Sequence, residues 1–405
     1  MAIENEFSDE NVREYARACF NIAESLVERS QKDDFNTLLI PSRGAVPFFI
    51  GSMYVLQCLG NDYEDHHELA DRINIPNLIR EYVMPADVVP AVKSDKRKVN
   101  ILLCPFTADI NMQPFAQDVG LEGKLSVDEF VNDTRKYWTK VVHALTEGKK
   151  GRAKDPYLQF YLYLLRNVEN RAELAFEYET AERVDGIAMI DTVISGRAST
   201  TILDGFKEEG ILPYSLLVID NNGRNLKEPY STKIRIGESY GNIKPVHVPR
   251  IFTEDRGASL EGVFGIVYPS LMFYANGIEL KKEPFFPVGA GSWYHLPGNN
   301  PHEKAFKTFC EMLKSAITIE CADYSGCVDK SNEEKKMVES RKELVNILKS
   351  NKLLVSNHAP TSFIKLRLPI QRIYETSSHV VHICFSPEIS RNVVNKFRRK
   401  FEYDK

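Results

Sequence analysis

The sequence predicts an α/β protein built on a parallel-rich, doubly wound sheet. Short apolar segments of strand length alternate along the chain with segments of helical periodicity. The strand-like segments are apolar throughout, which is typical of strands buried on both faces. Two of them, residues 35–40 and 186–191, lead directly into turns rich in glycine and hydroxyl residues. Turns at the carboxyl ends of parallel strands are where such sheets bind ligands, so the same segments point to a site.

Composition and charge exclude several classes of protein. The 405 residues are 43% hydrophobic and 27% charged, which is ordinary for a globular chain with one large or two modest domains. A formal net charge of −4 gives no overall attraction to nucleic acid or anionic membrane, so any polyanion site must be local. No apolar run approaches the roughly 20 residues of a membrane helix, and the acidic start resembles no signal peptide. We therefore expect a cytoplasmic protein without a membrane partner.

The cysteines and histidines predict no metal centre. The seven cysteines are scattered and form no CxxC pair, and the nine histidines show no HExxH or similar spacing. This pattern argues against structural zinc and against a disulfide framework.

The first 106 residues predict a helix followed by two strands. Ser8 and Asp9 are residue types that cap helices, and apolar residues recur at helical spacing up to Lys32. A strand at 35–40, a tight turn and a helix at 45–59 follow. Residues 60–98 are polar and broken by prolines, which indicates an insertion before a second strand at 99–106.

The middle of the chain predicts a second insertion and then the most informative segment. Residues 107–182 combine loops with helices, the last of them long and rich in aromatic residues. The segment then reads as a strand at 186–191, a turn at 192–200, an amphipathic helix closed by Gly210, and a strand over Tyr214–Asp220.

The domain prediction divides the chain at residue 250. Residues 1–250 carry the sheet with its helical insertions at about 60–98 and 107–182. Residues 251–405 form an additional C-terminal α+β region of unassigned role, with helices near 302–316 and 332–350 and a strand signal at 379–385. The C-terminal end of this region is locally basic (Arg391, Lys396, Arg398, Arg399 and Lys400). We interpret these residues as the solvated face of a helix, with contact to phosphate or nucleic acid as the alternative.

The candidate site centres on Asp191 and the turn that follows it. An acid at the carboxyl end of a buried strand lies at the ligand-binding edge of the sheet. Behind it, small residues allow main-chain amides to approach an anion, hydroxyls can donate, and the next helix presents its positive end. We expect the acid to hold ribose hydroxyls while the turn holds a 5′-phosphate (Thr192, Ser195, Gly196, Arg197, Ala198, Ser199 and Thr200).

The segment IAMIDTVISGRAST resembles the phosphoribosyl pyrophosphate motif of type I phosphoribosyltransferases. The resemblance to this family covers about residues 35–225. The family has two adjacent acids where this chain has Asp191 alone. The turn Ser42-Arg43-Gly44 is similar to the family's pyrophosphate-binding turn. The resemblance implies that Arg43 neutralises leaving-group charge and that Gly44 lets the backbone approach, with Mg²⁺ carried by the substrate's phosphates.

Three functions follow as alternatives. The first is transfer of ribose 5-phosphate to a nitrogenous base with release of pyrophosphate, with Arg43 and Asp191 as the catalytic residues. The second is a non-catalytic, nucleotide-sensing regulator or effector subunit with a protein partner or a second copy of itself, which the single motif acid favours. The third is a nucleoside or nucleotide glycosidase, for which Asp220 or Glu254-Asp255 would supply a second carboxylate.

Overall fold

The described residues build a five-stranded sheet in which every pairing is parallel, with the strand order β2-β1-β3-β4-β5. The computed structural model describes residues 7–32, 35–73, 99–103, 139, 186–252, 301–326 and 330–350. The predicted α/β class is confirmed. The strands are β1 (Thr37–Ile40), β2 (Asn100–Leu103), β3 (Ile187–Val193), β4 (Tyr214–Ile219) and β5 (Ile243–His247).

The strands are apolar because the sheet is covered on both faces. All four residues of β1 and all seven of β3 are buried. The register aligns Leu38 of β1 with Ile101 of β2 on one side and with Ala188 of β3 on the other. Burial on both faces removes the reason for polar residues to alternate with apolar ones, so the strands read as continuous apolar runs.

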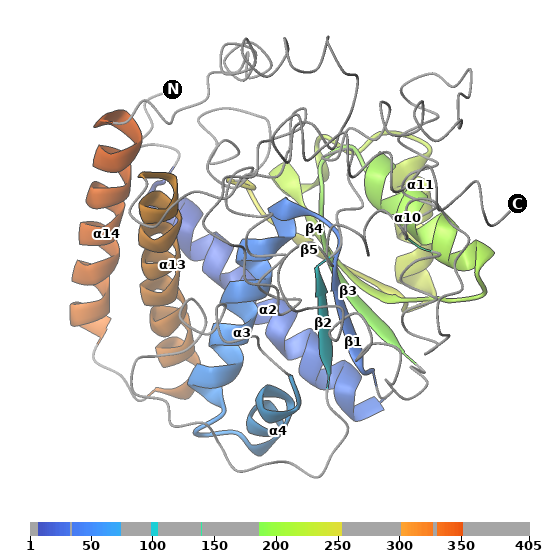
Figure 1. Cartoon of the computed structure of the whole chain (residues 1–405), viewed down its shortest axis with the longest axis horizontal. Helices are drawn as coiled ribbons and strands as arrows, with labels where there is room; N and C mark the ends of the chain where they lie inside the picture. Colours follow the sequence, from blue (N-terminus) through green and yellow to red (C-terminus); the bar gives the residue numbers. More distant parts are fainter. Residues whose placement is uncertain are drawn as a thin grey trace, which may run out of the picture.

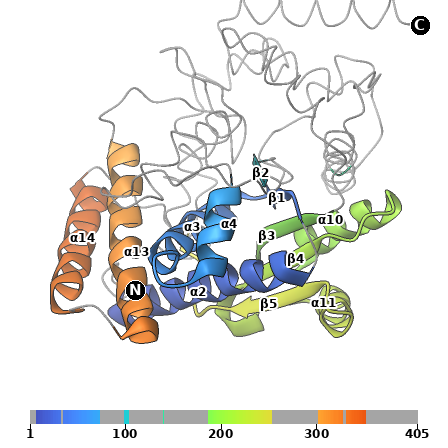
Figure 2. The ribbon, with the colours of Figure 1, turned by 90° about the horizontal axis from the view of Figure 1, so that it is seen from below.

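The helices lie on opposite faces of the sheet according to the strands that they connect (Figure 1, Figure 2). The connection from β1 to β2 carries α3 (Val46–Leu59) and α4 (Glu64–Arg72), while α10 (Arg197–Glu208) and α11 (Tyr230–Ser239) follow β3 and β4. Parallel crossovers are right-handed, so a change in the direction of strand addition moves the helix to the other face. The sheet is therefore doubly wound, as the sequence predicts.

A further layer of helices covers α2 (Asp9–Lys32) and α3 on the side away from α10 and α11 (Figure 1). It consists of α13 (Pro301–Ser325) and α14 (Lys330–Ser350), which pack against each other. Because α3 lies between α2 and α13, most of its residues are apolar and buried. The helices of residues 301–350 thus share one core with the sheet.

A cluster of aromatic rings joins these layers. The ring of Tyr15 in α2 stacks on Phe48 of α3 with centroids 3.9 Å apart and on Phe252 with centroids 5.1 Å apart. Phe309 of α13 meets Tyr15 edge-on at 5.9 Å. Stacked and edge-on pairs of this kind add to the free energy gained by burying the rings.

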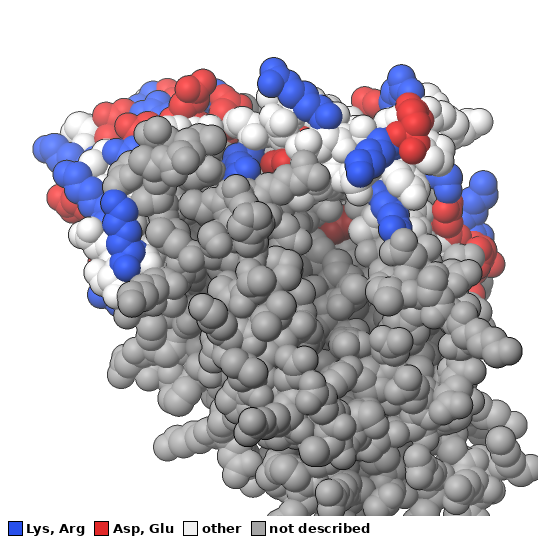
Figure 3. All heavy atoms as spheres, turned by 90° about the horizontal axis from the view of Figure 1, so that it is seen from above, with Lys and Arg blue, Asp and Glu red and all other residues white. Residues whose placement is uncertain are grey.

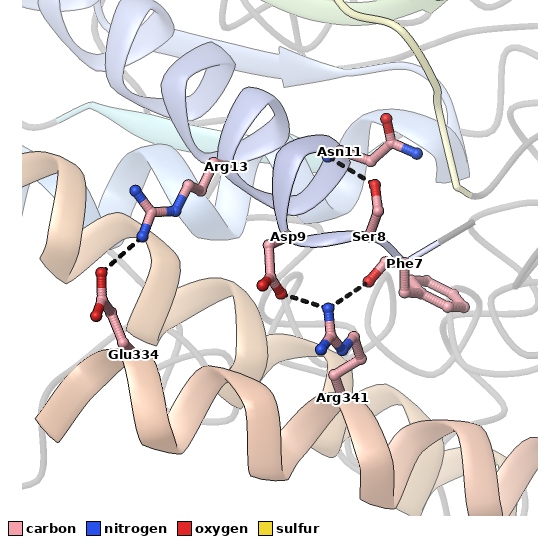
Figure 4. Close-up of polar contacts among 7 residues, drawn as sticks. All are labelled: Phe7, Ser8, Asp9, Asn11, Arg13, Glu334 and Arg341. Carbon is pink, nitrogen blue, oxygen red and sulfur yellow. Dashed lines mark hydrogen bonds and ion pairs between the residues drawn. The ribbon is translucent and has the colours of Figure 1, made fainter. Parts of the chain in front are cut away.

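Polar contacts fix the start of α2 against α14 (Figure 4). Ser8 accepts a hydrogen bond from the amide of Asn11 at 3.2 Å, so the predicted helix cap is confirmed. Arg341 of α14 donates to the carbonyl of Phe7 at 3.4 Å and pairs with Asp9. Arg13 pairs with Glu334 at 2.8 Å. Exposed pairs of this kind contribute little individually, but here they orient two helices that are distant in the sequence.

Several boundaries differ from the sequence prediction. Helix α10 begins at Arg197 rather than after Thr200, α13 runs on to Ser325, and α4 lies inside the predicted insertion at 60–98. Strand β5 and helix α11 were not predicted. The insertion at 107–182 except residue 139, the strand signal at 379–385 and the basic residues 391–400 lie outside the described residues.

The surface of the described residues carries both signs of charge. On the face shown in Figure 3, Lys and Arg side chains are interspersed with Asp and Glu. Among the helices that the structure describes, none is long and apolar enough to span a membrane.

Gly51 tests the packing of α3. A Cβ added there would collide with Sγ of Cys19 in α2 and lie 3.1 Å from Cδ1 of Ile317 in α13. We expect Gly51→Val to lower the free energy of unfolding by about 1 to 3 kcal/mol through overpacking. Urea denaturation measures this change. Lys342→Val, on the exposed face of α14, is the matched control, and an equal loss in both variants would contradict the close packing at Gly51.

Candidate functional site

The two predicted ligand turns meet at the carboxyl edge of the sheet. Strands β1 and β3 pair directly, with Leu39 in register with Met189. Continuing that register places Ser42 opposite Thr192, and their hydroxyl oxygens lie 3.2 Å apart at hydrogen-bonding distance. The turn η1 (Arg43–Ala45) therefore lies beside the loop that follows β3.

This meeting point is also where the strand order reverses. The chain adds β2 on one side of β1 and β3, β4 and β5 in turn on the other. Connections leaving β1 and β3 diverge to opposite faces of the sheet at this point. In open α/β sheets, ligands bind at that switch point.

Asp191 is buried and bound to its own loop. Its side chain is 2% exposed. Oδ1 accepts the amide hydrogen of Thr192 at 2.8 Å, and Oδ2 accepts the hydroxyl of Ser199 at 2.6 Å. Because successive side chains of a strand alternate between faces, Asp191 points to α10 while Thr192 points to the turn after β1. The carboxylate therefore fixes the path of the loop onto the helix.

The hydroxyls of the loop are largely engaged within the protein. Ser199 donates to Asp191, and Thr200 Oγ1 donates to the carbonyl of Gly196 at 2.8 Å. Both side chains are buried, whereas Ser195, Arg197 and Ala198 are partly exposed. The hydroxyl of Ser195 is thus better placed than those of Ser199 and Thr200 to reach a ligand.

Main-chain amides at the start of α10 point to an anion site. The first helical hydrogen bond runs from the amide of Thr200 to the carbonyl of Gly196 at 3.1 Å. Within the described part of the chain, the amides of Ser195, Gly196, Ala198 and Ser199 donate to no main-chain carbonyl. The N-cap is a glycine, so no side chain of its own caps the helix. Such an uncapped helix start carries positive potential, which favours a nearby negative charge.

The loop is supported from behind by the segment after β4. Gly196 has φ +86°, and an added Cβ would lie 2.8 Å from Cβ of Tyr230. The amide of Lys227 donates to the carbonyl of Ser195 at 3.2 Å. The space at the Gly196 α-carbon is therefore filled by α11, and the absence of a side chain there serves packing and backbone conformation.

The carboxyl end of β4 forms the neighbouring part of the edge. Asp220 is buried, and its carboxylate accepts the amide of Ile251 at 2.9 Å and the side-chain amide of Asn225 at 3.3 Å. Asn221, Asn222 and Gly223 follow with φ values of 50°, 52° and 83°. Three successive left-handed residues are rare and concentrate at functional sites. The asparagine-glycine pair is the sequence signal for this turn.

The remaining predicted site residues are placed as follows. Gly44 is buried within η1, while the side chain of Arg43 lies outside what the structure describes. Arg197 is the first residue of α10 and is partly exposed. Glu254 and Asp255 lie outside the described residues. Among the residues described, no three His, Cys, Asp or Glu side chains gather to hold a metal ion.

The hydrogen bond between Ser199 and Asp191 can be tested by stability. Ser199→Ala removes a bond to a buried carboxylate, and we expect it to lower the free energy of unfolding by about 1.5 to 3 kcal/mol. Thr201→Ala is the matched control, because its hydroxyl only bonds back to the carbonyl of Arg197 at 2.8 Å. Chemical denaturation of both variants measures the difference. A Ser199→Ala effect no larger than that of Thr201→Ala would contradict the role assigned to Asp191.

Comparisons with known proteins identify no relative. No protein-family model, no curated protein and no solved structure matches this chain. What bears on function is therefore the chain's own geometry at the switch point.

Proposed function

We propose that the chain binds a ligand carrying ribose 5-phosphate, either phosphoribosyl pyrophosphate or a nucleotide, in a phosphoribosyltransferase-like pocket. The observation that carries the proposal is the meeting of the turn after β1 with the loop after β3, marked by the 3.2 Å contact between Ser42 and Thr192. Both turns lie at the reversal of strand order, where this class of sheet binds ligands.

In this proposal the 5′-phosphate binds at the start of α10. The amides of Gly196, Ala198 and Ser199 and the hydroxyl of Ser195 supply its donors, and the helix dipole favours its charge. The hydrogen bonds around Asp191 and the packing of Tyr230 on Gly196 hold the loop in shape before the ligand arrives. A site formed in advance loses less entropy on binding.

The turn after β1 takes the other end of the ligand. Arg43, through its charge, and the main chain of η1 would face the pyrophosphate of phosphoribosyl pyrophosphate or the ribose of a nucleotide. Mg²⁺ would arrive on the ligand's phosphates and hydroxyls, since this hard ion prefers such oxygens.

The bonds of Asp191 favour a second candidate, a pocket that senses the ligand without turnover. A catalytic acid at the ribose must offer its oxygens to the sugar, yet both oxygens of Asp191 already accept bonds from the protein. Asp220 is likewise engaged by Ile251 and Asn225, which counts against its use as the second carboxylate of a glycosidase. These bonds favour binding alone over binding with transfer, and hydrolysis ranks last.

A charge placed in the loop tests the phosphate site. Ala198 is partly exposed in the first turn of α10, where an acid is favourable for the helix itself. We expect the Ala198→Asp variant to be as stable as the wild type. Because the new carboxylate repels the phosphate, the variant should bind phosphoribosyl pyrophosphate with Mg²⁺, or nucleoside monophosphates, at least about tenfold more weakly. Calorimetric titration measures the affinities.

Ala198→Asn controls for size, because asparagine matches aspartate in shape without the charge. Wild-type affinity in Ala198→Asn together with loss in Ala198→Asp supports the phosphate site. Equal affinities in all three proteins, or no binding of these ligands by the wild type, would refute it.

Turnover separates the first candidate from the second. Wild-type protein is mixed with phosphoribosyl pyrophosphate, Mg²⁺ and each common nucleobase, and pyrophosphate release is measured. If the protein is a transferase, we expect release with one base and its loss in Arg43→Ala. Binding without release across the bases would instead assign the pocket to sensing.

A further inference from the structure

We propose that Cys58 and Cys321 form an oxidisable thiol pair, which a hydroperoxide such as hydrogen peroxide closes into a disulfide between α3 and α13. Cys58 lies in the last turn of α3 and Cys321 near the end of α13. The two helices pack directly, and the hydroxyl oxygens of Tyr54 and Thr318, about one helical turn before the two cysteines, lie 3.3 Å apart, which places the two thiols side by side. Thiols in contact can join without a large movement of either helix.

The surroundings assign different roles to the two thiols. The hydrogen bond from Cys321 is the largest cause that lowers the pKa of Cys58, with smaller contributions from the hydroxyls of Tyr54 and Thr318 and the charge of Lys314. The same hydrogen bond and burial raise the pKa of Cys321, and Glu320 and Glu24 act in the same direction. Cys58 is partly exposed and Cys321 is buried. Cys58, which is partly exposed, is therefore the thiol that a hydroperoxide reaches first, and Cys321 is the buried partner behind it.

The polar groups around the pair come from the helices packed on it. Tyr54 of α3 and Thr318 of α13 have their hydroxyl oxygens 3.3 Å apart, and Nζ of Lys314 lies 5.5 Å from the centre of the Tyr54 ring. Burial and then the charge of Cys58 raise the pKa of the Tyr54 phenol, with a smaller contribution from the charge of Glu333 of α14. Tyr54 therefore remains a neutral hydrogen-bond donor beside Cys58.

The reaction proceeds in two balanced steps. The Cys58 thiolate attacks one oxygen of the hydroperoxide, so an S–O bond forms, the O–O bond breaks, and the leaving oxygen takes up a proton as water or alcohol. The Cys321 sulfur then attacks the Cys58 sulfenic acid, so the S–S bond forms and the S–O bond breaks. The proton of Cys321 leaves with that oxygen as water. Both sulfurs are oxidised and the hydroperoxide is reduced.

The disulfide would link α13 of the outer helical layer to α3. Neither cysteine belongs to the candidate site. The turn η1 lies at the start of α3, whereas Cys58 lies at its end. Oxidation should therefore raise the thermal unfolding temperature, because it cross-links elements far apart in the sequence. Ligand affinity at the switch point should be unchanged, so this inference does not depend on the proposed function.

The experiment treats the full-length chain with hydrogen peroxide and analyses it under non-reducing conditions. Intact mass and peptide mapping should show a loss of two hydrogens and a linked Cys58–Cys321 peptide, both reversed by dithiothreitol. In Cys321→Ser, dimedone should trap a persistent sulfenic acid at Cys58, because no partner thiol remains to remove it. At neutral pH, iodoacetamide should label Cys58 faster than Cys310, whose pKa burial raises.

Cys310→Ser is the matched control, since Cys310 is buried in the same helix as Cys321. This variant should form the bridge as the wild type does, whereas Cys58→Ser and Cys321→Ser should not. Three results would overturn the proposal: no linked peptide in the wild type, a bridge from Cys58 to a different cysteine, or overoxidation of Cys58 while Cys321 remains a free thiol.

Discussion

The reversal of strand order between β1 and β3 is the constraint on which the rest of the structure depends. It sends α3 to one face of the sheet and α10 to the other, so both faces are covered and the strands are buried. The same reversal makes the two connections diverge at the carboxyl edge, which is where sheets of this class bind ligands. Core and candidate site are thus two consequences of one topological feature.

The carboxylate of Asp191 shows how the core supports that site. An ionised group is costly to bury unless its oxygens are hydrogen-bonded, and here the amide of Thr192 and the hydroxyl of Ser199 satisfy them. Those bonds tie the last residues of β3 to the first turn of α10. The groups left to meet a ligand are chiefly main-chain amides, whose direction is set by the backbone and therefore by the fold. In the proposed site, recognition of an anion would therefore depend on loop shape more than on particular side chains.

The outer helices extend this support to the far side of the sheet. Tyr15 packs against Phe48, Phe252 and Phe309, so α2 joins α3 to α13 through aromatic rings. The thiol contact between α3 and α13 lies in the same interface. A covalent bond there would constrain the end of α3 that carries Cys58. The turn after β1 lies at the opposite end of the same helix. A change in stability at this end of α3 would therefore be separable from the proposed ligand binding at its other end.

The sequence by itself determined the α/β class, the apolar strands, the cap at Ser8 and the two turns, because each depends on local periodicity or on the conformational preference of a few neighbouring residues. It placed Asp191 at the last position of a strand, whereas β3 continues to Val193. It did not show β5, the early start of α10 at Arg197 or the left-handed turn after Asp220, where local signals are short or ambiguous. Only the tertiary structure decided that Ser42 meets Thr192 and that Asp191 turns inward to Ser199. Strand register and the packing of α10 make those contacts, and neither is set by residues adjacent in the chain.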